Sequence, residues 1–133
     1  MTKLKMELFS GGLYIPIQLW SVAENRYRRI SLMLDTGASV TTISPEIFHQ
    51  LGYEPTQVNS ATITTASSVE RVSQFMLQSI KLGDIELHNV EAYAHKFPEE
   101  SFAIGVVGLN VLRQFDIQLL FSQNLIILDK IID

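Results

Sequence analysis

In the stretch Leu32-Met33-Leu34-Asp35-Thr36-Gly37-Ala38-Ser39, an apolar run stops at an acid, a hydroxyl and a glycine. Short apolar runs bounded by turn residues are typical of buried strands. We therefore predict a core strand that ends at Asp35. A carboxylate at such a place is costly to bury unless it is hydrogen-bonded or paired. On its own, Asp35-Thr36-Gly37 is also compatible with an ordinary turn in which Asp35 bonds its own backbone.

A second motif lies near the end of the chain, at Gly105-Val106-Val107-Gly108-Leu109-Asn110-Val111-Leu112. It predicts a short apolar strand closed by Gly108, followed by a short helix that Asn110 could cap. Between the two motifs, residues 40–43 are β-branched and predict a strand. The helix that follows has a hydroxyl N-cap at Ser44, a proline at its first position and Gly52 at its end.

These motifs, in this order, resemble the retropepsin-like aspartic proteases, the single-lobe family that includes the retroviral proteases. The first motif is similar to the family's active-site loop, and the second to its glycine-containing signature before the last helix. The resemblance implies that Asp35 is catalytic and that Thr36 hydrogen-bonds across a dimer. It also implies that the Gly37 N–H approaches the carboxylate, and that Ala38 and Ser39 complete the loop, with Ser39 bonding the outer oxygen of Asp35.

The remaining chain predicts many short strands separated by turns, which indicates an all-β fold. We expect one domain over residues 1–133, a closed, barrel-like acid-protease lobe with one or two short helices. Leu4, Met6 and Leu8 are expected on one face of a first strand. Pro16 indicates that the second strand, residues 13–20, is bulged or at an edge. A last pair of strands is expected over residues 115–120 and 125–128.

A polar β-hairpin is predicted from residues 61–65 and 69–73. By the resemblance it is the flap that closes over substrate, with Thr65, Ala66, Ser67 and Ser68 as the candidate tip residues. Flaps of the family usually carry glycine at the tip, and this tip has none. An ordinary surface hairpin is the alternative interpretation.

Composition narrows the function classes. The net charge is −4, and three arginines in residues 26–29 form the one basic cluster, so we expect no nucleic-acid partner. The chain has no Cys, which excludes disulfides, thiol nucleophiles and Cys-zinc sites. Its three histidines show no ligand spacing, so we expect neither a metal nor a cofactor; they are His49, His88 and His95.

The sequence also shows no pattern typical of a targeting signal. No apolar stretch approaches the roughly 20 residues that span a bilayer, so we expect no membrane partner. A Cys-free chain without a signal-peptide pattern favours the cytoplasm. No Gly-x-Ser-x-Gly motif indicates a serine nucleophile.

Peptide hydrolysis by carboxylates needs two of them around one water: one takes its proton, and the other donates to the carbonyl oxygen. This chain has a single Asp-Thr-Gly. The second carboxylate must then come from an identical chain, with Asp35 beside a twofold axis. We therefore hypothesise a homodimeric aspartic endopeptidase acting on peptide or protein substrates. A catalytically silent domain of the same fold, serving dimerisation or peptide binding, is one alternative; an unrelated β-barrel with a chance match is another.

Overall fold

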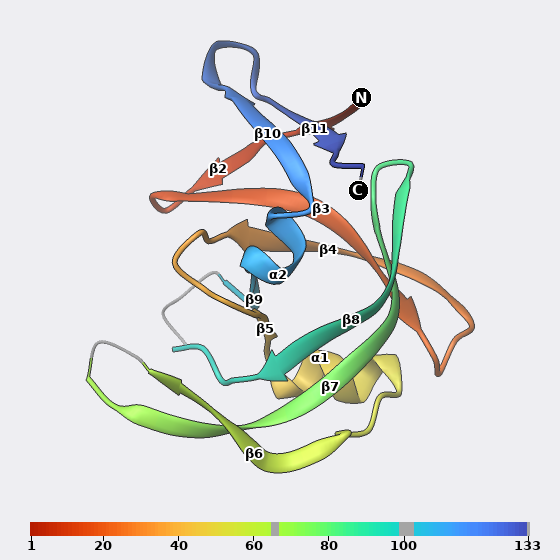
Figure 1. Cartoon of the computed structure of the whole chain (residues 1–133), viewed down its shortest axis with the longest axis vertical. Coiled ribbons are helices and arrows are strands. Elements are labelled where there is room, and N and C mark those ends of the chain that lie inside the picture. Colours follow the sequence, from red (N-terminus) through yellow and green to blue (C-terminus); the bar gives the residue numbers. More distant parts are fainter. Residues whose placement is uncertain (65–66, 99–102, 133) are drawn as a thin grey trace.

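The computed structural model describes residues 1–64, 67–98 and 103–132 (Figure 1). Strands dominate it, and the helices are short. In chain order the elements are β1 (Thr2–Lys5), β2 (Glu7–Phe9), β3 (Gly12–Ser21), β4 (Arg26–Leu34), β5 (Thr41–Ile43), α1 (Pro45–Leu51), β6 (Gln57–Thr64), β7 (Val69–Leu82), β8 (Ile85–Ala94), β9 (Gly105–Val107), α2 (Leu109–Leu112), β10 (Phe115–Leu120), the 3₁₀ turn η1 (Phe121–Gln123) and β11 (Leu125–Lys130).

The larger sheet has eight strands in the order β2-β3-β4-β9-β5-β8-β7-β6, and β3 also pairs with β7. This extra pairing joins Gln18 to Lys81 and Leu19 to Ile80, so the strands from β3 round to β7 form a closed ring. The Tyr53 hydroxyl supports the closure, because it donates to the Trp20 carbonyl at 2.7 Å and accepts from the Gln78 N–H at 3.2 Å. The prediction of an all-β, barrel-like fold with short helices is confirmed.

The core fills the inside of this ring and the space between it and α1. Phe48 of α1 is fully buried and stacks on Phe75 of β7, with ring centroids 4.1 Å apart. Helix α1 begins at Pro45 and is closed after Leu51 by Gly52, whose φ of +84° is the left-handed conformation that glycine adopts without strain. One detail of the prediction is wrong: the Ser44 side chain makes no capping hydrogen bond.

Along strand β3, Ile15, Ile17 and Leu19 are buried at alternate positions. Beside it, β2 pairs with residues 12–14 and β7 with residues 18–19. Pro16 falls in the gap between these two partners, where its missing N–H costs no ladder hydrogen bond on that side. The predicted first strand, by contrast, is divided at Met6 into β1 and β2. Leu4 and Met6 are buried, whereas Leu8 is exposed, so the shared face expected for all three was wrong.

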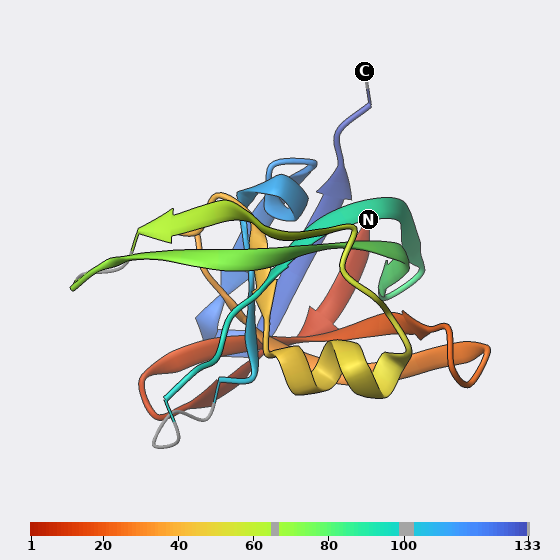
Figure 2. The ribbon, with the colours of Figure 1, turned by 90° about the horizontal axis from the view of Figure 1, so that it is seen from below.

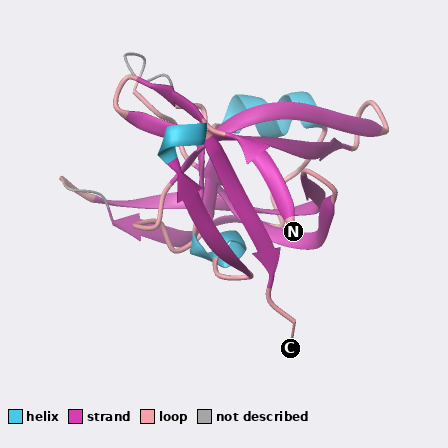
Figure 3. Cartoon of the chain, turned by 90° about the horizontal axis from the view of Figure 1, so that it is seen from above, coloured by secondary structure: helices cyan, strands magenta, loops and turns pink. Residues whose placement is uncertain are grey.

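Both ends of the chain belong to a smaller sheet with the order β1-β11-β10 (Figure 3). Residues 2–5 pair with residues 125–128, and the Met6 N–H donates to the Asn124 carbonyl at 2.8 Å. Leu4, Ile126 and Leu128 from this sheet are buried in the common core. Within one chain, therefore, the termini pair with each other.

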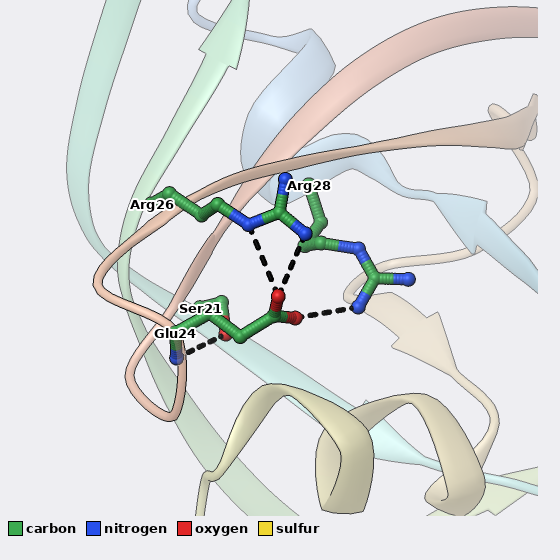
Figure 4. A network of polar contacts seen from close by, with 4 residues as sticks. All are labelled: Ser21, Glu24, Arg26 and Arg28. Carbon is green, nitrogen blue, oxygen red and sulfur yellow. Dashed lines mark hydrogen bonds and ion pairs between the residues drawn. The ribbon is translucent and has the colours of Figure 1, made fainter.

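The hairpin between β3 and β4 is organised around Glu24 (Figure 4). Its backbone N–H donates to the Ser21 hydroxyl at 3.0 Å, and Asn25 has a φ of +54°. The Glu24 carboxylate accepts from Arg26 at 2.7 Å and from Arg28 at 2.8 Å. The basic cluster predicted here is thus partly neutralised within the hairpin.

Candidate active site

Strand β4 delivers Asp35 to the surface at the point where its pairing with β9 ends. The two strands are parallel, with Met33 opposite Val106 and Leu34 opposite Val107. The Asp35 N–H continues the ladder by donating to the Val107 carbonyl at 3.1 Å. Asp35 is half-buried, as expected for a group at the end of a core strand. Its backbone is therefore held by the sheet while its carboxyl group reaches the surface.

The loop after β4 turns back on the carboxylate. The Gly37 N–H donates to Asp35 Oδ1 at 2.9 Å, and the Ala38 N–H donates to the Asp35 carbonyl at 3.3 Å. A Cβ on Gly37 would lie 3.1 Å from Asp35 Oδ1. The first bond has the form of an ordinary Asx turn and orients the carboxylate, whereas the second closes the backbone turn.

The second motif crosses this loop and fixes it. The Leu109 N–H donates to the Ala38 carbonyl at 2.8 Å, and the Asn110 N–H donates to the Ser39 carbonyl at 3.1 Å. The crossing depends on Gly108, because a Cβ there would lie 2.7 Å from the Val40 carbonyl carbon and 2.8 Å from the Ala38 oxygen. The two sequence motifs therefore form one structural unit.

A polar node under the loop connects three segments: β5, β8 and the second motif. Asn110 Oδ1 accepts from the N–H and the hydroxyl of Thr41, at 2.8 and 2.9 Å, and Asn110 Nδ2 donates to the Glu91 carbonyl at 2.8 Å. The buried Thr41 hydroxyl also accepts from the Gly108 N–H at 3.1 Å. Gly108 occupies the N-cap position of α2, so the prediction that Asn110 caps this helix was wrong. The Asn110 side chain instead bonds to Thr41 of β5 and to the Glu91 carbonyl of β8.

Asp35 opens into a cavity of about 590 Å³. The walls come from the loop after β4, from β5 and β9, and from β8 with the segment that follows it. The lining residues are Asp35, Gly37, Ala38, Ser39, Val40, Thr42, Tyr93, His95, Phe97 and Val106. Four of the predicted loop residues thus border one cavity, whereas Thr36 is exposed and lies outside the lining.

The predicted flap corresponds to the β6–β7 hairpin, whose last described pair is Thr64 with Val69. In Figures 1 and 2 this hairpin extends outward on the same side of the molecule as the loop after β4. Of its candidate tip residues, Ser67 and Ser68 are exposed and do not line the cavity. Thr65 and Ala66 lie outside the described residues.

Sequence reasoning missed the aromatic wall of the cavity, made by Tyr93, His95 and Phe97. A signal for it was present: these residues alternate with Ala92 and Ala94, which are buried in the core. In a strand such alternation places one set on the core face and the other on the opposite face. Burial, together with the neighbouring Glu91 carboxylate, raises the pKa of the Tyr93 hydroxyl, so this hydroxyl keeps its proton.

Two further features concern the described part of the chain as a whole. No group of three or more acidic or histidine side chains in it is arranged to hold a metal ion. None of its helices has the length and apolar character needed to cross a membrane.

Known proteins resemble this chain in sequence and in fold. The family model described as "gag-polyprotein putative aspartyl protease" matches residues 22–114. An uncharacterized protein in the cobV 5′ region of a Sinorhizobium species is 30% identical over 91 residues, which are 67% of this chain and 39% of that protein. The chain therefore spans about two fifths of the length of this relative.

Two solved structures share the fold. A retropepsin-like aspartic protease from Rickettsia conorii superimposes with a TM-score of 0.68 at 22% identity, over 96% of this chain and 88% of that one. The retroviral protease-like domain of Ddi1 from Leishmania major gives a TM-score of 0.58 at 15% identity, over 90% of each chain. The family match covers both motifs and most of the ring of strands. This chain therefore belongs to the retropepsin-like aspartic proteases of the gag-polyprotein type.

Proposed function

We propose that this chain is an aspartic endopeptidase that works as a homodimer. In this proposal a water molecule is held between Asp35 of two identical chains and attacks the peptide carbonyl. The observation that carries the proposal is the position of Asp35, half-exposed in a cavity and held by a loop that the second motif braces. Such a loop fixes the carboxylate in one orientation, which general acid–base catalysis requires.

The chemistry follows from bringing two carboxylates together. Two such groups about 3 Å apart cannot both ionise, so the pair shares one proton. The ionised member takes a proton from the water, and the protonated member donates to the carbonyl oxygen as negative charge develops there. The dyad titrates as a unit, and we expect activity where the pair carries one proton, in the acidic range.

The neighbours of Asp35 have separate proposed roles. The Gly37 N–H, 2.9 Å from Oδ1, is proposed to orient the carboxylate. Thr36 is exposed beside Asp35, which suits a residue that hydrogen-bonds to the second chain. Ser39 borders the cavity and is proposed to bond the outer carboxylate oxygen. The substrate is proposed to be an extended peptide, held between the cavity and the β6–β7 hairpin by added strand pairing.

Asp35→Asn tests the proposal because it keeps the side-chain shape but cannot act as a base or share the proton. We expect cleavage of a denatured protein or a peptide library to fall by about 10²-fold or more, with an unchanged fold. Asp116→Asn on β10, which alters an exposed acid, is the matched control and should cleave like the wild type. The assay covers acidic to neutral pH, and sedimentation establishes the oligomeric state.

Cleavage that survives in Asp35→Asn would overturn the proposal. A confirmed dimer without any cleavage by the wild type would overturn it as well, in favour of a silent domain that dimerises or binds peptides.

A further inference from the structure

Glu91 on β8 contacts three parts of the site through separate atoms. Its backbone carbonyl accepts from Asn110 Nδ2 at 2.8 Å, in the polar node under the loop after β4. Its carboxylate accepts from Gln74 Nε2 at 2.9 Å, and it also accepts from the Tyr93 hydroxyl. The backbone of Glu91 therefore serves the loop, while its side chain serves the cavity wall and β7.

Tyr93 is the member of this group that borders the cavity. It is the next-to-last residue of β8, it pairs with Thr42 and Gln74, and its half-buried side chain lines the same cavity as Asp35. Strand pairing fixes the backbone, but a side chain still has a choice of rotamers. Glu91 lies two residues earlier, on the same face of the strand. Its bond to the Tyr93 hydroxyl therefore selects one position of the ring.

Gln74 stands at the base of the β6–β7 hairpin. Its backbone lies between Gln57 of β6 and Tyr93 of β8. Its carbonyl accepts from the N–H and the hydroxyl of Thr56, at 2.7 and 3.0 Å. The Gln74 side chain then reaches the neighbouring strand at Glu91. The Glu91 carboxylate thus joins the cavity wall to the hairpin that is proposed to hold the substrate.

We propose that Glu91 is a positioning residue for substrate binding: its carboxylate holds the Tyr93 ring on the cavity wall and connects that ring, through Gln74, to the base of the hairpin. This inference rests on the proposed function and adds to it a residue outside the cavity lining. Glu91 acts through Tyr93 and takes no part in the proton transfers at Asp35.

The expected signature is weaker substrate binding with unchanged chemistry. Tyr93 contacts the substrate equally in the bound state and in the transition state, so its displacement raises KM and leaves kcat unchanged. The loop that carries Asp35 depends on the Glu91 carbonyl, which a side-chain substitution does not remove.

The test measures kcat and KM with the library peptide that the wild type cleaves fastest. Glu91→Leu removes both side-chain bonds, whereas Glu91→Gln keeps an acceptor oxygen for the Tyr93 hydroxyl. Glu86→Leu is the matched control. Glu86 also lies on β8 and accepts from a tyrosine hydroxyl, that of Tyr27, but it is outside the cavity lining.

We expect KM to rise by about tenfold in Glu91→Leu, as for the loss of a hydrogen bond to a charged group, with kcat unchanged. Glu91→Gln and Glu86→Leu should keep a KM close to that of the wild type. An unchanged KM in Glu91→Leu, or an equal rise in Glu86→Leu, would overturn the positioning role. A KM as high in Glu91→Gln as in Glu91→Leu would overturn it as well.

Tyr93→Phe shows whether Glu91 acts through Tyr93, and it tests the same bond if Glu91→Leu does not fold. This variant removes only the hydroxyl, so KM should rise and kcat should not change. Adding Glu91→Leu to Tyr93→Phe should raise KM little further, because the effects of residues that act as one unit do not add. An unchanged KM in Tyr93→Phe, or a double variant in which the two increases multiply, would overturn the positioning role.

A binding measurement separates this inference from the proposed function. An array of immobilised extended peptides, probed with the same variants, reports affinity without catalysis. If the wild type cleaves no peptide but binds the array, and Glu91→Leu weakens that binding by about tenfold while Glu91→Gln does not, the positioning role stands and the protease proposal fails. Cleavage with an unchanged KM in Glu91→Leu gives the reverse result. A wild type that neither cleaves nor binds peptides overturns both.

Discussion

Thr41 supplies two of the bonds that hold the loop after β4 in place. It is 2% exposed, and its hydroxyl both donates to Asn110 Oδ1 and accepts from the Gly108 N–H. Both partners belong to the second motif, so this hydroxyl connects the start of β5 to the turn that crosses the loop. Removal of a buried hydroxyl leaves its partners unsatisfied, at a cost of about 1–3 kcal/mol.

Thr41→Val tests this node, because valine has nearly the same shape as threonine but no hydroxyl. We expect the free energy of unfolding to fall by about 1–3 kcal/mol in urea denaturation, because the Gly108 N–H loses its acceptor. Cleavage should fall as well, since the crossing that holds Ala38 and Ser39 loosens. Thr41→Ser keeps the hydroxyl and should retain most of the activity. Equal stability of the valine variant and the wild type would show that the hydroxyl carries no net stabilisation.

The β3–β4 hairpin lies at the opposite end of β4 from Asp35, and its charges give a pH-dependent contribution to stability (Figures 1 and 4). Hydrogen bonds from Arg26 and then Arg28 lower the pKa of the Glu24 carboxyl below its ordinary value of 4.5. A pKa that is lower in the folded state means that the ionised form stabilises folding. This contribution is present above about pH 4.5 and is lost as the pH falls through the lowered pKa.

Glu24→Gln should therefore lower the urea midpoint slightly at neutral pH. The difference from the wild type should shrink as the pH falls below 4.5 and vanish once the pH has fallen below the lowered pKa, because both side chains are then uncharged. High ionic strength at neutral pH should also shrink it, since the ion pairs are exposed and screened. A difference that grows on acidification would contradict the sign of this coupling. Cleavage should not respond to the substitution.

At the scale of the whole molecule, the proposed dimer requires a surface through which two chains bring their Asp35 residues together. The ends of the chain pair within the small sheet, but the residues just past β11 are apolar and exposed: Ile131 is 41% and Ile132 is 92% exposed. Exposed apolar side chains beside a sheet are candidates for an interface with a second copy. We predict that this end of the chain contributes to the dimer.

Ile132→Asp tests this prediction without removing any strand pairing. We expect the dimer dissociation constant, measured by sedimentation over a concentration series, to rise by about tenfold or more, since a buried isoleucine contributes about 1.5–3 kcal/mol. The unfolding midpoint of the monomer should not change. Val22→Asp is the control, because Val22 is 42% exposed in the distant β3–β4 hairpin and should leave the dimer unaffected. An unchanged dissociation constant in Ile132→Asp would place the interface elsewhere.

Much of this architecture is encoded locally. The apolar run ending at Asp35, the alternation of Ile15, Ile17 and Leu19, and the Pro45 and Gly52 signals around α1 each depend on neighbours in the chain. Burial and backbone sterics act on such short stretches directly, so the strands, the first helix and the turn after Asp35 were predictable. The two glycine motifs also indicated the family that the sequence comparison shows.

Other features depend on contacts between residues far apart in the chain. The sequence gives no register, so it could not show that Asn110 bonds Thr41 rather than capping α2, or that the first strand changes face after Met6. The ring closes through β3 and β7, and the wall of Tyr93, His95 and Phe97 faces Asp35's cavity only because β5 pairs with β8. The local sequence was therefore enough to predict the position of Asp35 and the turn that follows it. Strand pairing over long distances in the chain decided what surrounds them, because it alone sets which side chains share a face.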